Sequence, residues 1–191
     1  MNTPALIKEI QEKLGVTQDG AIGPETLRAI YAFIIPPSQA ELLIEDAVDA
    51  RSEKTIATLL PELRPYARAL VHEAATVGIT IKIISGTRTY AEQDALYAQG
   101  RTKPGPKVTN ARGGYSNHNF GAAFDVGVFS GNRYVPKSPA YKAVGAIGKR
   151  LGLEWGGDWR SIVDEPHFQH MNGKTLAQAR ELHAQGKTVF S

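Results

Sequence analysis

Residues 116–128, Ser-Asn-His-Asn-Phe-Gly-Ala-Ala-Phe-Asp-Val-Gly-Val, carry the clearest structural pattern in the chain. From Ala123 onward, bulky apolar residues alternate with small or acidic ones, which is the period of a half-buried strand. If the bulky residues face the core, Asp125 points from the opposite face, beside alanine and glycine. His118 lies in the loop that feeds this strand. The pattern therefore predicts a strand that presents a carboxylate and a histidine to an open site.

A second segment with histidines, residues 164–170, reads Asp-Glu-Pro-His-Phe-Gln-His. The proline favours an extended backbone before His167. On a strand at 167–170, His167 and Gln169 share one face, and Phe168 and His170 share the other.

Together the two segments offer two imidazoles and one carboxylate, which leave one position open on a tetrahedral zinc ion. That is the arrangement of catalytic zinc, and Asp164 or Glu165 is then a candidate general base. The same donors also suit non-haem iron. Spacing alone leaves open a third interpretation, a polar loop with hydrogen-bonded histidines.

The rest of the chain mixes helices and strands without regular βαβ alternation, which predicts an α+β fold. We expect a small antiparallel sheet with flanking helices, preceded by a small all-α module. The expected strands are 79–84, the segment around 124–128, 153–155 and 167–170; the expected helices are a long one that ends before Gly78, then 90–98, 139–151 and 175–185. Residues 101–114 are expected to form a basic loop.

The N-terminal region has its own pattern of short helices. Thr3 is the expected N-cap of a helix that ends at Gly15, and a turn at 19–24 leads into a second helix. A third helix is expected at 38–51, after Pro36 and Pro37. The chain is therefore divided into residues 1–51, a helical module, and residues 52–191, the main domain.

Composition excludes several classes of protein. The 191 residues carry a net charge of +3, which is too mild to indicate nucleic-acid binding. The charge is uneven, since residues 1–70 sum to −3 and residues 71–191 to +6, so the second part favours an anionic partner. There is no cysteine, which excludes disulfides and thiolate metal sites. The sequence has no apolar run of membrane-spanning length, and its first residues do not have the pattern of a signal peptide.

Several separated motifs in residues 55–172 resemble one known family. Ser116-x-His118-x-x-Gly121-x-Ala123-x-Asp125 matches the SxHxxGxAxD signature of the VanX/VanY-type zinc D-alanyl-D-alanine peptidases, and Asp164-x-x-His167 resembles that family's second signature. Residues 85–89 and 153–159 resemble further segments of the family. Within this family, the chain most resembles the L-alanyl-D-glutamate endopeptidases that serve as phage endolysins, which share the D-x-P-H-F ending.

The resemblance implies a role for each matched residue. It implies that His118, Asp125 and His167 bind zinc. It implies that Asp164 is the general base and then the acid, and that Arg88 stabilises the oxyanion. It also implies that Ser116 and Trp155 contact the substrate and that Trp159 lies near the cleft. Three positions depart from the family pattern: Thr87 replaces a tyrosine, the base is Asp164 instead of the glutamate of some relatives, and His170 is an additional histidine.

The N-terminal region resembles a second family. Ile10-Gln11, Leu14 and residues 19–26 are similar to the LQ…DGxxGPxT core of small helical peptidoglycan-binding modules. A helical extension that packs on the catalytic domain remains the alternative.

Together the resemblances imply a peptidoglycan hydrolase that cleaves the stem peptide with zinc-activated water, at the L-Ala–D-Glu bond. They imply a monomeric phage endolysin that is made in the host cytoplasm, acts on the cell wall, and associates stably with neither membrane nor nucleic acid. The alternatives are a D,D-carboxypeptidase that removes terminal D-Ala, a non-catalytic peptidoglycan-binding protein, and a non-haem iron oxygenase.

Overall fold

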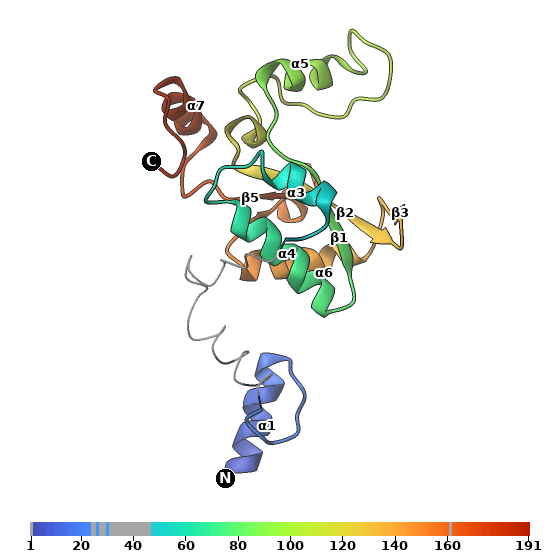
Figure 1. The fold of residues 1–191 in the computed structure, drawn as a ribbon, viewed down its shortest axis with the longest axis vertical. Helices are drawn as coiled ribbons and strands as arrows, with labels where there is room; N and C mark the ends of the chain where they lie inside the picture. The colour runs from blue at the N-terminus through green and yellow to red at the C-terminus, as the bar shows by residue number, and fades with distance from the viewer. Residues whose placement is uncertain (1, 24–25, 27–29, 31–46, 161) are drawn as a thin grey trace. The chain divides into compact units, whose positions relative to one another are not determined.

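The computed structural model describes residues 2–23, 26, 30, 47–160 and 162–191 (Figure 1). Contacts divide the chain into two compact units, Met1–Leu43 and Ile44–Ser191, which are described separately below. Among the described residues, no helix combines the length and the apolarity that crossing a membrane requires.

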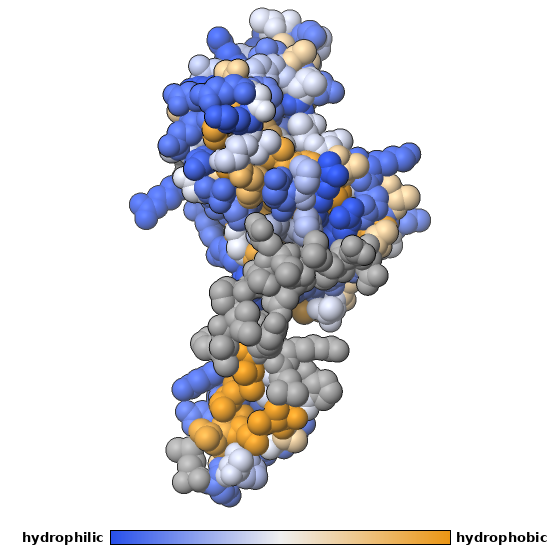
Figure 2. Space-filling model, turned by 60° about the vertical axis from the view of Figure 1, so that its left-hand side comes forward, coloured by the Kyte–Doolittle hydropathy of each residue, from blue (hydrophilic) through white to orange (hydrophobic). Residues whose placement is uncertain are grey.

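The described part of the N-terminal unit is a helix followed by a turn that a buried glutamine holds. Helix α1 spans Thr3–Leu14 and ends at Gly15 as predicted, but its N-cap is Asn2 and not Thr3, because the Asn2 side chain accepts the amide of Ala5. The Gln11 side chain donates to Asp19, to the Ala21 carbonyl and to Thr26, and accepts the amide of Gly20. The glutamine of the LQ motif therefore closes the turn. Figure 2 shows hydrophobic side chains gathered on this unit.

The helices predicted from residue 24 and at 38–51 fall mainly outside the described residues. Residues 47–49 are irregular, and a helix begins only at Ala50, where Asp49 provides the N-cap. The division into a module of residues 1–51 and a domain of residues 52–191 stays a prediction.

The second unit is built on one antiparallel sheet of order β1-β2-β5-β4, with β3 paired to the far end of β2. Its strands are β1 (Thr80–Ser85), β2 (Ala123–Ser130), β3 (Arg133–Tyr134), β4 (Glu154–Trp155) and β5 (His167–Gln169). The helices are α3 (Ala50–Ile56), α4 (Arg64–Thr76), α5 (Tyr90–Ala98), α6 (Ala140–Arg150) and α7 (Leu176–Ala184), with 3-10 turns η1 (Asn117–Phe120) and η2 (Gly156–Asp158). The predicted α+β class is confirmed.

The sheet buries one face against helices and leaves the other face to polar residues. Phe124 and Val126 of β2 and Phe168 of β5 are fully buried, and the two phenyl rings stack with centroids 5.9 Å apart. Helices α3 and α4 pack against β1, and α6 packs against α4 and β4 (Figure 1). The alternation predicted for β2 therefore holds, since Asp125 lies between two core residues and faces the other way.

The pairing of β1 with β2 is interrupted near the end of β1, in the manner of a β-bulge. The register with β2 shifts between Ile83 and Ser85. The buried amide of Ile83 donates to the Ser52 hydroxyl of α3, 2.9 Å away. Bulges of this kind often redirect backbone groups next to functional sites, and this one leads directly to Gly86, whose carbonyl contacts the site described next.

Candidate metal centre

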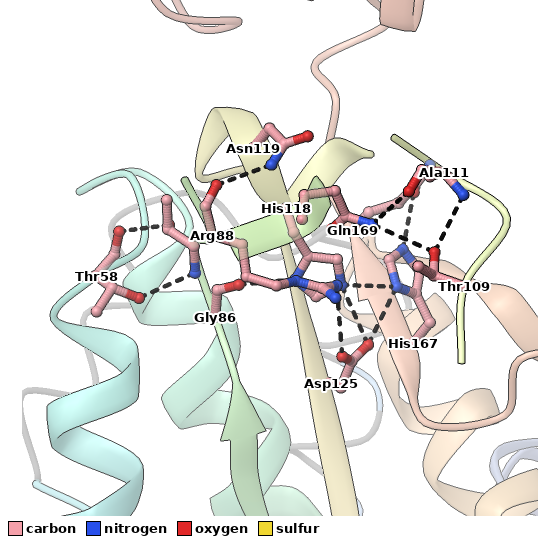
Figure 3. A network of polar contacts seen from close by, with 12 residues as sticks. Thr58, Gly86, Arg88, Thr109, Ala111, His118, Asn119, Asp125, His167 and Gln169 are labelled. Carbon is pink, nitrogen blue, oxygen red and sulfur yellow. Dashed lines mark hydrogen bonds and ion pairs between the residues drawn. The ribbon is translucent and has the colours of Figure 1, made fainter. Parts of the chain in front are cut away.

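Three side chains from three separate elements converge at the polar face of the sheet. His118 comes from η1, Asp125 from β2 and His167 from β5, and the last two are directly paired across the strands. Figure 3 shows both imidazoles and the carboxylate pointing toward one another. His118 Nε2 lies 3.2 Å from His167 Nδ1 and 3.3 Å from Asp125 Oδ1, and His167 Nδ1 lies 3.2 Å from Asp125 Oδ1.

This nearly equilateral triangle fits zinc. At a Zn–N distance of about 2.0–2.1 Å, two donors of a tetrahedron lie about 3.3–3.4 Å apart. The three observed separations of 3.2–3.3 Å match one face of that tetrahedron and leave its fourth corner open. The donor atoms are thus placed to bind one ion without rearrangement.

The outer nitrogens of the two imidazoles explain why a cation belongs between the donors. His118 Nδ1 lies 2.8 Å from the Gly86 carbonyl, which can only accept, so this nitrogen carries the proton. His167 Nε2 lies 3.0 Å from Gln169 Oε1. That oxygen also accepts from Asn117, while the Gln169 amide donates to Glu154, so Nε2 is the protonated nitrogen of His167. The inner nitrogens, His118 Nε2 and His167 Nδ1, then carry no proton and present lone pairs. Two such nitrogens and a carboxylate together form a set of ligands for a metal ion.

The buried Asp125 carboxylate needs positive charge beside it to stay ionised. Burial raises the pKa of its carboxyl, but the positive charge and hydrogen bonds that His118 and His167 can supply outweigh this effect and hold the pKa below its ordinary value. With both inner nitrogens unprotonated, a cation bound between the three donors would supply that charge instead. The carboxylate is therefore ionised and available as a ligand.

Asp164 lies beside the triangle in the connection before β5. The amide of His167 donates to the Asp164 carbonyl, and the amide of Asp164 donates to the Gly156 carbonyl. Burial, and then the negative charge of Asp125, raise the pKa of the Asp164 carboxyl above its ordinary value. A Cβ on Gly156 would lie 2.5 Å from the Asp164 carbonyl oxygen and 3.0 Å from His167 Cβ, so the packing here requires glycine.

Arg88 borders the other side of the site. Its Nη2 is 4.0 Å from Asp125 Oδ2, and its backbone amide donates to the His118 carbonyl. Burial lowers the pKa of the guanidinium, and the charge of Asp125 partly offsets this effect. Arg88 Nε is buried and has no hydrogen-bond partner among the described residues, which leaves one donor of a fixed cation unused.

The remaining predicted residues differ in how close they lie to the triangle. Ser116 is the N-cap of η1, and its side chain makes no capping hydrogen bond. Trp155 is 8% exposed: its indole donates to the Glu165 carbonyl, and its ring packs so closely on Gly145 of α6 that a Cβ there would clash. Trp159, in contrast, is 36% exposed, and its ring centroid is 4.8 Å from that of His167.

Two further side chains were not assigned a role from sequence. His170 lies on the opposite side from His167, against Tyr66 and Phe190, as strand parity predicted. Gln169 shares the face of His167 and orients its imidazole, and the alternation at 167–170 is the sequence signal that finds it.

A metal site with three protein donors, next to a carboxyl group of raised pKa, is typical of metal-dependent hydrolases.

Comparisons with known proteins agree with this class of enzyme. A family model described as D-alanyl-D-alanine carboxypeptidase, of the M15 peptidases, matches residues 109–170. Over 123 residues the chain is 43% identical to the peptidoglycan L-alanyl-D-glutamate endopeptidase CwlK of Bacillus subtilis (strain 168), covering 58% of this chain and 72% of the relative.

Two more distant similarities extend the comparison. The L-alanyl-D-glutamate peptidase of Listeria phage A118 is 31% identical over 123 residues, which cover 63% of this chain and 41% of the phage protein. The crystal structure of the Serratia marcescens L-Ala D-Glu endopeptidase ChiX superposes with a TM-score of 0.51 at 23% identity, covering 66% of this chain and 91% of that one, which supports the fold.

The extent of the match to the Bacillus protein shows the family: the chain belongs to the M15 metallopeptidases. The donor set fits zinc and iron alike, but the family is one of zinc peptidases, so the iron oxygenase alternative is set aside.

Proposed function

We propose that the protein is a zinc-dependent peptidoglycan hydrolase that cleaves the L-Ala–D-Glu bond of stem peptides. The single observation that carries the proposal is the triangle of His118, Asp125 and His167 with Asp164 and Arg88 beside it, in a chain that is 43% identical to an L-alanyl-D-glutamate endopeptidase.

The proposed chemistry divides between the metal and the protein. A zinc ion held by His118, Asp125 and His167 would lower the pKa of a water molecule and would polarise the scissile carbonyl. Asp164 takes the proton of the attacking water and then gives it to the leaving amine. The raised pKa of this carboxyl suits both steps, since it can accept the proton and hold it until the amine leaves.

Arg88 is proposed to stabilise the charge that develops on the carbonyl oxygen. The guanidinium is held near the site by the backbone bond to His118, and its buried Nε is a donor without a partner among the described residues. A preorganised donor of this kind acts most strongly where charge appears in the transition state.

Ser116 and the two tryptophans are proposed contacts for the peptide. Trp159 is the better placed of the two rings, because it is exposed beside His167 whereas Trp155 packs in the core. The Ser116 hydroxyl is not used in capping η1 and is therefore available for substrate.

The N-terminal unit is proposed to bind peptidoglycan, on the similarity of its glutamine-held turn to small wall-binding modules. The full protein is proposed to be a monomeric phage endolysin that is made in the host cytoplasm and lyses the wall. The phage peptidase among the relatives supports this more specific assignment.

A D,D-carboxypeptidase is the second candidate, because the matching family model carries that description. Mass spectrometry of purified peptidoglycan, digested with and without a chelator, separates the two functions. Chelator-sensitive release of stem peptides that begin at D-Glu, with L-Ala left on the glycan, supports the endopeptidase. Release of free D-Ala alone supports the carboxypeptidase. An unchanged wall overturns both and supports a non-catalytic binding protein.

A further inference from the structure

Residues 99–116 form a long loop between α5 and η1, which we call the basic arm. It contains Arg101, Lys103, Lys107 and Arg112 and no acidic residue. Figure 1 shows α5 and this loop projecting beyond the sheet. Loops of this length without regular structure are uncommon in compact domains and usually serve a function.

The base of the arm is joined to the metal centre. The chain enters α5 directly after Arg88 and returns through η1 to His118, and the Arg88 amide donates to the His118 carbonyl across this gap. The buried Asn119 side chain donates to the Arg88 carbonyl and accepts the amide of Gly114. Substrate held along the arm is therefore held next to the site.

The arm is also built as a fixed structure. Gln93 of α5 is fully buried and donates to the carbonyl of Ala111, and Asp94 accepts the amide of Gly113. The Arg101 guanidinium donates to two backbone carbonyls, those of Tyr97 and Thr109. Because these bonds already hold the backbone of the arm, binding a partner here has to order mainly the exposed side chains.

The outer surface of the arm has a positive potential. The side chains of Lys103, Lys107 and Arg112 are exposed. The guanidiniums of Arg101 and Arg112 lie 3.9 and 5.0 Å from the centre of the Tyr97 ring. A hydrogen bond from Arg112, and then the charges of Arg112, Arg101 and Lys107, hold the pKa of the Tyr97 hydroxyl below its ordinary value, so the arm favours an anion at its surface.

We propose that the basic arm is a second contact surface for the polymeric substrate, and that it binds the carboxylates of stem peptides adjacent to the one being cleaved. This inference rests on the proposed function and adds the part of the substrate that lies outside the site. A glutamate residue has two carboxyl groups, and extending a peptide through one of them leaves the other free. A peptidoglycan strand therefore repeats a carboxylate at each stem, whereas a single short peptide offers no neighbouring stem for the arm to bind.

The test compares polymeric and short substrates. The variant Lys103→Gln/Lys107→Gln removes two exposed charges, and a triple variant adds Arg112→Gln. A control variant, Arg133→Gln/Lys137→Gln/Lys142→Gln, removes three exposed charges from around β3 and the start of α6. Each protein digests insoluble sacculi, first extracted to remove phosphate polymers, and a soluble peptide that contains one L-Ala–D-Glu bond.

At low salt we expect the triple variant to digest sacculi roughly tenfold more slowly than the wild type and the double variant to lie between them, since exposed charges act additively and are screened by salt. The difference should shrink at high salt, and rates on the soluble peptide should not change.

Equal rates on sacculi for the triple variant and the control overturn the proposal. An equal loss on both substrates also overturns it, because the arm would then act through the site. The same rates are also measured on unextracted sacculi, and an effect that is present there but absent on extracted sacculi assigns the arm to phosphates and overturns the carboxylate proposal.

Sedimentation with sacculi separates this inference from the proposed function. The slowly cleaving Asp164→Asn protein is mixed with sacculi for a time too short for digestion, with and without the arm substitutions, and the bound fraction is measured. Weaker sedimentation of the arm variant supports the surface even if the wild type cleaves nothing, and unchanged sedimentation contradicts it even if the wild type is active.

Discussion

The proposed metal ligands and the proposed catalytic residues are held by different parts of the backbone. Asp125 and His167 lie on paired strands, with their Cα atoms in register, and the ligand that comes from η1, His118, has its ring fixed by the Gly86 carbonyl. Arg88 and Asp164 come from connections, and each is tied to the ligands through one backbone hydrogen bond.

This difference separates two tasks. Paired strands position two of the three donor atoms, and the hydrogen bond to the Gly86 carbonyl positions the third, whereas Asp164 and Arg88 lie beside the triangle. Substitutions among the three donors should therefore change metal binding, and substitutions of Asp164 or Arg88 should change turnover with the metal retained.

The largest effect is expected from His118→Ala or Asp125→Ala. Removing one of three donors should abolish stoichiometric zinc and all measurable hydrolysis, because the remaining two donors no longer enclose the ion. Elemental analysis after dialysis measures the zinc content. His170→Ala, which changes a histidine on the opposite side of β5, is the matched control and should retain one zinc per chain. A ligand variant that keeps one zinc would refute the assignment.

Asp164→Asn should leave zinc content unchanged and lower kcat by about 10²-fold or more, the usual range for a missing general base. Glu165→Gln tests the neighbouring carboxyl and should stay near the wild-type rate, since the contact that fixes Glu165 is made by its backbone carbonyl. If Asp164→Asn stays active while Glu165→Gln does not, the base is Glu165.

A smaller effect is expected where the sheet supports the ligands from outside. Gln169→Ala removes the acceptor of the His167 Nε2 proton and should weaken zinc binding by about 10- to 100-fold. Glu154→Gln keeps an acceptor for the Gln169 amide and should bind zinc nearly as well as the wild type. Chelator competition measures both constants, and equal affinity of Gln169→Ala and wild type would show that the imidazole needs no such support.

The smallest effect should appear only in stability. Ser52→Ala leaves the buried Ile83 amide at the bulge without its acceptor and should lower the free energy of unfolding by about 1–3 kcal/mol. Thr76→Ala, at an exposed hydroxyl, should change it by less than about 0.5 kcal/mol. Urea denaturation measures both, and the zinc affinity of folded Ser52→Ala should match that of the wild type. A stable Ser52→Ala protein would mean that water replaces the hydroxyl.

The sequence predicted those parts of the site that depend on strand alternation. Because side chains alternate along a strand, the sequence placed Asp125 on the other face from Phe124, and His167 on the other face from Phe168. The order of the motifs along the chain indicated that the two segments belong to one site. The resemblance to known peptidases supplied the roles of Arg88 and Asp164, which lie in connections without a period of their own.

Contacts made through the backbone could not be predicted in this way. The bond from His118 to the Gly86 carbonyl lies directly after the register shift in β1, and no residue type predicts that shift. The sequence also did not decide the N-cap, because Asn2 and Thr3 are neighbours that can both serve as one. The burial of Trp155 depends on its close packing against Gly145, which the sequence pattern does not show.

The most direct test of the central claim is anomalous diffraction at the zinc edge from crystals of the zinc-loaded protein. We expect one strong peak, about 2.0–2.1 Å from His118 Nε2, Asp125 Oδ1 and His167 Nδ1, with the triangle of donors unchanged. A peak bound by other residues, or no peak between these three donors, would contradict it.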